Sequence, residues 1–449
     1  MKQLIVLLIV FASFSAATSL AQDISGSWVG ELSSVRESDP FHGLRILLTV
    51  SKAESGGWKA VLYTVEPNIE KYGGRPLPVT SIRLENPSLQ FSIDTVHGQY
   101  VGTLSNDASV IKGRWTQGNG WRELDLRRRI PALTRIGSEE LEQVLDAARG
   151  KPDTKVAEQL SGLELTDRLS AVSHLRDIAN MLGPHAKQAF LVLADKSALL
   201  DPPASEIPSL EVPDGEAQRR MIALTVDYVK QMIHQMPNLF ATRSTTSLEE
   251  DFWDGKTLHP IGKFSTVVLY RDGRETHKST LVRVGEKKQP PNLPTSEVPG
   301  LTTIGEFGPI LSIAMMDAPH GDLVWKRWEA GAEGPEAVFS YAVSAENSHY
   351  RVDEICSAYR GEFAINPATG AILRLVIRAD PEIGMALLRA DIAVEYGPVR
   401  LGDKTYICPV KSIAISRRLL TGWLNDVVFD QYHLYRATSR VLPGFTEAP

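Results

Sequence analysis

The chain has 449 residues, which at about one domain per 150 residues predicts two to three folding units. Hydrophobic residues make up 43% of the sequence, enough for sizeable cores. The formal net charge is -6, and phosphate backbones select strongly basic surfaces, so the composition excludes nucleic acid as an expected partner.

The first 21 residues have the pattern of an export signal. A positive charge at Lys2 precedes an apolar run from Leu4 to Phe14, and the predicted cleavage lies between Ala21 and Gln22. We therefore expect a periplasmic or secreted protein. The mature chain has no apolar stretch of the ~18 residues that a membrane span needs, and no cysteine follows the cleavage site to carry a lipid.

The chain contains two cysteines, Cys356 and Cys408. In an oxidising compartment, two cysteines inside one predicted domain favour a disulfide, and this is the prediction made here. The alternative is a pair of free thiols, buried or exposed.

Residues 22–130 alternate apolar and polar side chains over short runs that turn-forming residues separate. Leu89, Phe91 and Ile93 show the period of two that is typical of strands. The runs predict eight strands, near residues 26–32, 44–51, 58–65, 79–84, 89–94, 99–104, 110–116 and 121–128. Eight antiparallel strands with short links favour an up-and-down β-barrel, and a flattened sandwich is the alternative.

This unit carries Gly26-Ser27-Trp28 on its first strand and an arginine, Arg127 or one of its two successors, at the end of its last strand. The pair resembles the motif of the calycin superfamily of lipocalin-like barrels. The resemblance implies a structural role for Gly26, Trp28 and Arg127. In that superfamily the tryptophan closes one end of the barrel, and the arginine packs across it. Any ligand would then enter at the other end. A barrel this small could instead fill with its own side chains and serve as an interaction module.

Residues 131–215 have a helical period and form a predicted connector. Helices are expected from Ser138 to the stop at Gly150, from Thr166 to about 183, and from His185 to about Leu200. A proline-rich stretch over residues 202–215 has the composition of a semi-rigid spacer and marks a predicted domain boundary.

Residues 216–442 begin with a predicted helix, Glu216 to Met236, and continue as hairpins up to a tail at 443–449. The pair Asp272-Gly273 is a strong hairpin signal, and Gly402-Asp403 joins two more strand-like runs. A helix followed by consecutive hairpins predicts one curved antiparallel sheet, so the whole protein is expected to be mainly β with α.

The order of elements in this unit is similar to that of the lipoprotein-sorting family of the bacterial envelope. That resemblance implies an open half-barrel whose apolar hollow is covered by helices and accommodates acyl chains. Four stretches also resemble uncharacterised secreted proteins of soil bacteria: Met236–Thr246, Gly305–Gly308, Tyr359–Gly361 with Ile365–Pro367, and Val394–Gly397.

No catalytic signature stands out in the sequence, and no cofactor or metal is predicted. The densest acidic group comprises Glu249, Glu250, Asp251 and Asp254, which we interpret as a solvated hairpin tip rather than a metal or acid–base site. Single histidines such as His277 and His349 are expected to form local hydrogen bonds.

Three hypotheses follow. The first is a soluble envelope binding protein that shelters an acyl chain or other hydrophobic ligand, with a lipid or lipoprotein as the implied partner. It needs no special residues, because each methylene transferred from water to an apolar wall contributes about 0.8 kcal/mol. The second is a non-catalytic interaction or sensor module with solid cores. The third is a hydrolase whose residues converge only in the fold.

Overall fold

The computed structural model describes residues 23–33, 41–53, 56–65, 76–129, 133–169, 175–251, 256–284, 287–288, 301–352, 355–380, 387–418 and 421–435. The predicted signal with Ala21 and Gln22, the residue Asp254 and the tail 443–449 lie outside these ranges. The chain divides into two compact units. One contains the residues up to Tyr63 together with Leu77–Arg128, and the other contains Thr64–Pro76 and the residues from Arg129 onward.

The first unit is an antiparallel sheet of ten described strands rather than the expected eight. Nine of them follow the order β4-β3-β2-β1-β10-β8-β7-β6-β5, and β9 pairs with β8 alone. The strands are β1 Gly26–Glu31, β2 Arg45–Lys52, β3 Trp58–Val65, β4 Pro76–Pro78, β5 Ser81–Glu85, β6 Ser88–Ile93, β7 Gly98–Leu104, β8 Val110–Gln117, β9 Gly120–Glu123 and β10 Leu126–Arg128.

Two features account for the difference in strand number. The run expected at 121–128 divides into β9 and β10 at Leu124 and Asp125, although Leu124 still donates its backbone N–H to Gly113 of β8 at 3.0 Å. The short β4 is the other addition. Between β4 and β5, Val79 donates its backbone N–H to Ala60 of β3, and Thr80 donates to Ser92 of β6. These two bonds connect the ends of the sheet order and curl it towards a barrel.

The interior of this unit is filled by aliphatic side chains together with a few large aromatic ones. Phe91 stacks on Tyr100 with ring centroids 4.8 Å apart, and Trp115 lies 6.2 Å from Phe91. The Tyr100 hydroxyl donates to the carbonyl oxygens of Ile111 and Leu124 at 3.2 and 3.0 Å. Burial and the nearby Asp125 raise the pKa of Tyr100 far above its usual range. This packing fits a core of side chains better than a hollow barrel.

Trp28 is fully buried, and its indole N–H donates to the Ile24 carbonyl at 3.0 Å. The arginine over its ring is Arg128, whose guanidinium lies 4.6 Å from the ring centroid and donates to the Ser25 carbonyl at 2.8 Å. Arg127, one position earlier, is exposed. The alternation of strand faces therefore assigns the packing position to Arg128 and corrects the choice of Arg127.

The second unit begins with the helical connector. Its elements are β11 Thr134–Ile136, α1 Ser138–Ala147, α2 Asp153–Ser161, β12 Leu163–Leu165, α3 Leu175–Ala179 and α4 Pro184–Ser197. Helices α1 and α4 agree with the expected positions, whereas α2 was not predicted. Helix α3 lies within the range expected for the second helix, but that helix does not begin at Thr166, since Thr166–Leu169 are not helical. The preceding residues form β12, in which buried Leu163 and Leu165 alternate with exposed Glu164, parallel to β11.

An antiparallel sheet of eleven described strands forms the rest of this unit, in the order β16-β15-β14-β13-β25-β24-β23-β22-β21-β18-β17. The strands are β13 Leu239–Asp251, β14 Lys256–Arg271, β15 Arg274–Val284, β16 Lys287–Lys288, β17 Asp322–Gly331, β18 Gly334–Val343, β21 Ala358–Ile365, β22 Ile372–Asp380, β23 Leu387–Leu401, β24 Lys404–Arg418 and β25 Thr421–Leu434. A separate hairpin consists of β19 Arg351–Val352 and β20 Ile355–Cys356.

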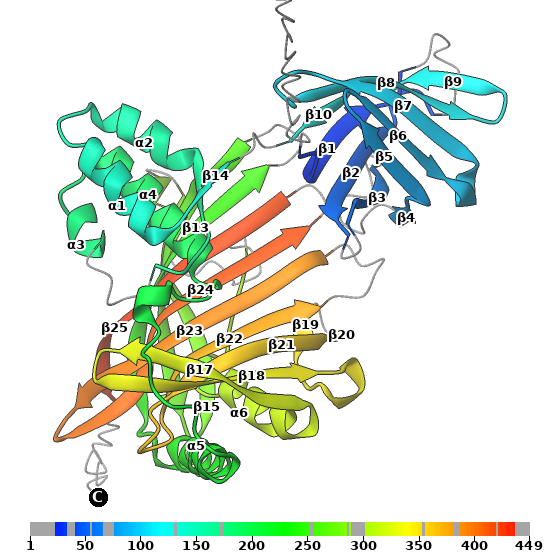
Figure 1. Ribbon diagram of the computed structural model, residues 1–449. Helices are drawn as coiled ribbons and strands as arrows, with labels where there is room; N and C mark the ends of the chain where they lie inside the picture. The colour runs from blue at the N-terminus through cyan, green and yellow to red at the C-terminus, as the bar shows by residue number, and fades with distance from the viewer. Residues whose placement is uncertain are drawn as a thin grey trace, which may run out of the picture. The chain divides into compact units, whose positions relative to one another are not determined.

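Helices cover the two faces of the C-terminal sheet. Helices α5 Gly215–Gln235 and α6 Pro309–Asp317 contribute Met221 and Leu311 to the core over β18, β21, β22 and β23. On the opposite face, Leu199, just after α4, packs against Val376 and Ala393. Figure 1 shows α1, α2 and α4 together near β13 and β14, with α5 and α6 together in another part of the unit.

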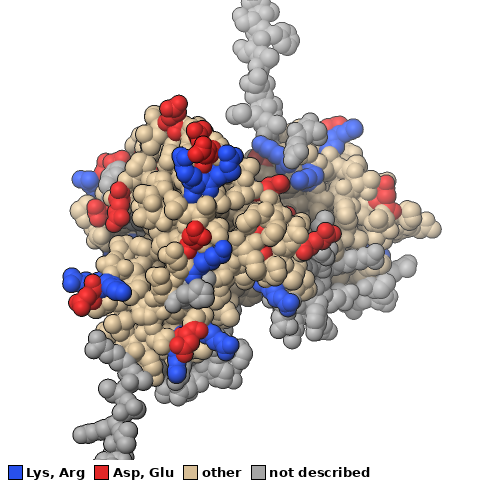
Figure 2. Space-filling model, turned by 90° about the horizontal axis from the view of Figure 1, so that it is seen from below, with Lys and Arg blue, Asp and Glu red and all other residues tan. Residues whose placement is uncertain are grey.

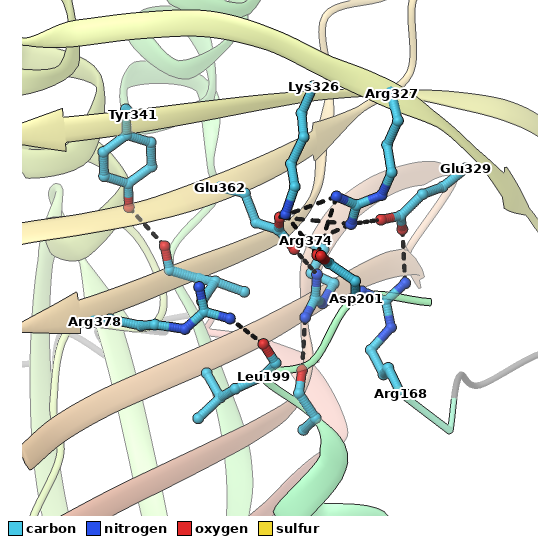
Figure 3. Close-up of polar contacts among 12 residues, drawn as sticks. Arg168, Leu199, Asp201, Lys326, Arg327, Glu329, Tyr341, Glu362, Arg374 and Arg378 are labelled. Atoms are coloured by element: carbon cyan, nitrogen blue, oxygen red, sulfur yellow. Dashed lines mark hydrogen bonds and ion pairs between the residues drawn. The ribbon is translucent and has the colours of Figure 1, made fainter. Parts of the chain in front are cut away.

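One buried ion pair holds the connector against the sheet, and other ion pairs join strands of the sheet beside it (Figure 3). Arg168 of the connector contacts Glu329 of β17 at 2.6 Å, and their side chains are 8% and 3% exposed. Glu362 of β21 accepts from Arg374 at 2.8 Å and from Lys326 at 2.7 Å. Burial raises the pKa of Glu362, but its basic neighbours together outweigh burial and lower that pKa to about 2.

The predicted disulfide is absent, and both cysteines are free thiols. Cys356 is exposed on β20, in the small hairpin outside the main sheet. Cys408 is buried on β24 among apolar side chains that include Met236 and Leu239, and burial raises the pKa of its thiol to about 12. Membership of one domain was thus an insufficient reason to pair them, because the two side chains belong to separate pieces of the fold.

Candidate functional site

A cavity of about 650 Å³ lies on the α6 side of the C-terminal sheet. Its walls come from the segment before α6, from the β19 hairpin and from β23, β24 and β25. Most of the lining residues are apolar: Leu301, Ile304, Ile310, Tyr350, Val352, Leu387, Ala390, Ile392, Ala414, Ile415 and Trp423. The polar lining residues are Thr302, Thr303, Arg351, Asp391, Ser416 and Arg418. The volume lies within the range of about 300–1,000 Å³ that is typical of small-molecule sites.

Buried polar contacts fix the segment that forms one wall. Arg243 of β13 donates to Thr303 Oγ1 at 2.6 Å and to Glu306 Oε1 at 3.2 Å. The Asn425 amide of β25 donates to the Leu301 carbonyl at 2.5 Å. Because the Arg243 and Glu306 side chains are 8% and 0% exposed, breaking their pair would leave a charge buried without its partner.

Three of the four segments that carry the sequence resemblance meet at this wall. Arg243 belongs to the first and Glu306 to the second. Tyr396 of the fourth donates its hydroxyl to the Glu306 carbonyl at 3.1 Å, and burial raises its pKa well above the usual range. Sequence reasoning identified these segments but assigned none of their residues to a site, since the contacts join positions far apart in the chain.

Glu275 of β15 supports the same wall from outside the cavity lining. Its carboxylate accepts the backbone N–H groups of Gly305 and Phe307 at 3.3 and 3.2 Å. His277 lies 2.6 Å from the same carboxylate. Gly305 has a φ of 103°, a left-handed conformation that favours glycine, which explains this residue at the bend before α6.

Tyr350 brings a hydroxyl to the cavity lining beside Asp391. Burial, followed by the charges of Asp391 and Glu306, raises the pKa of Tyr350 to about 12. The tyrosine therefore stays protonated at neutral pH and can donate a hydrogen bond to a bound molecule. Apolar walls with a few such donors can hold a hydrophobic ligand and orient its polar end.

The other residues considered in the sequence lie elsewhere. Glu249 and Glu250 are half-buried on β13 rather than at a solvated tip, and Glu250 lines a different hollow. His349 lies 2.6 Å from Asp317, so it contacts a local carboxylate, as does His277. Within the described ranges, no three His, Cys, Asp or Glu side chains are grouped so that they could hold a metal ion.

The surface shown in Figure 2 carries acidic and basic side chains close to one another, mostly in small mixed groups. It shows no extended area of a single charge on that face. Among the helices of the described residues, none is long and apolar enough to cross a membrane.

No protein-family model and no curated protein matches this chain. Among solved structures, a domain provisionally named for outer membrane lipoprotein sorting, from Vibrio parahaemolyticus, covers 49% of this chain and 94% of its own length, at 8% identity and a TM-score of 0.27. A DUF1329 family protein from Desulfovibrio piger gives the same values. A DUF3598 family protein of unknown function from Nostoc punctiforme covers 90% of this chain and 95% of its own length, at 8% identity and a TM-score of 0.16. Matches at these scores carry no argument about activity, and the lipocalin resemblance stays a prediction.

Proposed function

We propose that this is an exported binding protein of the cell envelope whose C-terminal unit shelters an acyl chain or a similar hydrophobic ligand in the cavity beside α6. The single observation that carries the proposal is that cavity, about 650 Å³ in volume and lined mainly by apolar side chains. The export pattern of residues 1–21 supports the location.

The energetics of such a site are those of simple transfer. Each methylene that leaves water contributes about 0.8 kcal/mol, so a chain of several methylenes offsets the cost of immobilising the ligand. Tyr350 and Thr302 of the lining give the polar end hydrogen-bonding groups, whereas the Thr303 hydroxyl already donates to Glu306 at 3.0 Å. No covalent step is required.

Filling the cavity tests the proposal. Ala390 lines the cavity, and its cross-strand neighbour Ala379 on β22 shares the same sheet face without lining it. We expect Ala390→Phe to weaken binding of a fluorescent fatty acid at least tenfold, because the ring occupies the ligand's space. The matched variant Ala379→Phe should bind as the parent protein does.

Native mass spectrometry of the exported protein provides the second measurement. A co-purifying lipid that is lost from Ala390→Phe and kept by Ala379→Phe would support the proposal. Equal binding by both variants would contradict it and favour the alternative of a non-catalytic interaction module. The aromatic packing around Tyr100 in the first unit already favours that alternative for the N-terminal barrel.

A further inference from the structure

A second hollow region lies on the opposite face of the C-terminal sheet, beneath the connector. It consists of two spaces of about 310 and 260 Å³. Five lining residues are common to both, so we treat the spaces as one region and call it the connector groove: Leu133, Leu193, Lys196, Glu250 and Leu258. The groove extends from Leu160 of α2 to Arg417 at the end of β24.

Leucine side chains supply most of the apolar wall of this groove. They come from the connector, as Leu165 and Leu200 do, and from the sheet, as Leu258 and Leu424 do. Leu193 is 3% exposed and belongs to the connector core, which makes this wall a fixed part of the fold. Such a wall suits an unbranched hydrocarbon chain, because it offers contact along its length and no hydrogen-bonding partner.

Basic side chains outnumber acidic ones along the groove. The described lining contains Arg135, Lys196, Arg389 and Arg417 against Glu164 and Glu250. Arg135 lies 3.7 Å from Glu164, and Arg389 lies 2.5 Å from Asp391. The positive charge that acts on Glu250 comes from Lys196, Arg417 and Arg129, of which Arg129 is only 3% exposed.

Glu250 is the carboxylate on which these three cations act. Burial raises its pKa, and the three basic neighbours lower it again without restoring the ordinary value. Among the described lining residues, the groove therefore combines an apolar wall with four basic and two acidic side chains in a partly desolvated place, where a charge-assisted hydrogen bond is stronger than in water.

We propose that the connector groove is a second ligand site for a single alkyl chain with an anionic head group. It shares Ile415, Ser416 and Trp423 with the cavity beside α6 and has its other walls to itself. The chain lies along the leucines, and a carboxylate or phosphate binds at Lys196 and Arg417. The site goes beyond the proposed function, because it binds ligands with an anionic head group, whereas the cavity beside α6 binds hydrophobic ligands without regard to charge. The segment before α6, which forms one wall of that cavity, does not line the groove.

Calorimetric titration of the full-length protein with dodecanoate and with dodecanol tests the head-group claim. The two probes share one chain and differ in charge. We expect dodecanoate to bind at least tenfold more tightly at this site. A third titration with dodecyl phosphate distinguishes a preference for carboxylate from one for phosphate, and either preference supports an anion site.

Two substitutions should change the affinity for the anion in opposite directions. Lys196→Gln should weaken dodecanoate binding at least fivefold, because it removes a cation. Glu250→Gln should strengthen it about threefold, because it removes a competing carboxylate. Neither should change dodecanol binding. Lys187→Gln is the control, since Lys187 lies on the same helix, donates to Asn180 at 3.0 Å and does not line the groove.

Each titration is repeated in the Ala390→Phe variant, in which the cavity beside α6 is filled. The results therefore test the groove and the cavity independently. Dodecanoate binding that survives Ala390→Phe and weakens in Lys196→Gln supports the groove. Binding that Ala390→Phe abolishes and Lys196→Gln leaves unchanged overturns the groove and leaves the cavity standing. Equal affinities for dodecanoate and dodecanol in the Ala390→Phe background would also overturn it. Circular dichroism and the Tm confirm that each variant is folded.

Discussion

Two glutamates on neighbouring strands show how position in this fold sets the behaviour of a single residue. Glu362 has three basic neighbours, which lower its pKa to about 2 against the opposing effect of burial. Glu336 of β18 lies directly opposite Glu329 of β17. Burial, and after it the charge of Glu329, raises the pKa of Glu336 to about 7. The two glutamates therefore differ in pKa, which lies below the ordinary value for Glu362 and above it for Glu336.

The raised pKa of Glu336 predicts a pH dependence of stability. Because the folded state holds this proton more tightly than the unfolded state, the contribution is complete below the unfolded pKa of about 4.5 and is lost as the pH rises through about 7. We expect Glu336→Gln to reduce the fall in the free energy of unfolding between pH 5 and pH 8 by on the order of 1 kcal/mol.

Urea unfolding of both proteins at the two pH values measures this difference. Glu362 does not interfere, because its titration lies below that window. The control is Glu333→Gln, an exposed glutamate in the same hairpin. If Glu336→Gln and the parent lose equal stability between pH 5 and pH 8, the assigned environment of Glu336 is wrong.

At the scale of elements, local sequence signals predicted hairpins well. Asp272-Gly273 forms the turn between β14 and β15, where both residues have positive φ values of 51° and 76°. Gly402-Asp403 joins β23 to β24, with Leu401 opposite Lys404. Helix α4 also agrees with its predicted place. These features depend on residues close together in the chain, and the sequence pattern contains that information.

Docking of one element on another depends on distant pairs, which the sequence pattern did not reveal. Arg168 and Glu329 are far apart in the chain and form a buried pair at 2.6 Å. We expect Arg168→Met to lower the free energy of unfolding by about 2 kcal/mol, because Glu329 loses this partner and keeps Arg327. The double variant with Glu329→Gln should lose less than the sum of the two single variants.

An exposed pair offers the comparison. Arg220 and Glu216 of α5 lie 2.7 Å apart with 66% and 71% of their side chains exposed. Arg220→Met should change stability by at most about 0.5 kcal/mol, because solvent screens the pair. Chemical denaturation measures the parent protein and the four variants. Similar losses for Arg168→Met and Arg220→Met would refute a role for Arg168 in docking the connector.

At the scale of the whole molecule, the period of two in the sequence predicted the mainly β architecture. The sequence did not predict the cavity wall, the connector groove or the free state of the cysteines. The cavity wall needs Arg243 to meet Glu306, and the groove needs Lys196 of α4 near Glu250 of β13. Long-range packing creates both. The disulfide prediction was wrong for the same reason, since compartment and domain membership do not bring two side chains together. The predicted connector and its boundaries stay a prediction.

Free thiols give the molecule a distinctive chemical response. A reductant should leave the Tm unchanged, because neither unit depends on a cross-link between Cys356 and Cys408. Iodoacetamide should label Cys356 in the native protein, whereas Cys408 should react only after unfolding, because it is buried and its thiol has a pKa raised to about 12. Mass spectrometry counts the labels, and a Tm that falls on reduction would show that a bridge exists.

Strand β25, the last of the described strands, lies between β13 and β24 rather than at an edge of the sheet. The C-terminal sheet therefore cannot be completed during synthesis until the residues up to Leu434 have left the ribosome. A prematurely terminated chain would present two unpaired strand edges, each a template for association with other chains. In the export that we propose, this dependence places closure of the sheet after the residues of β25 have emerged.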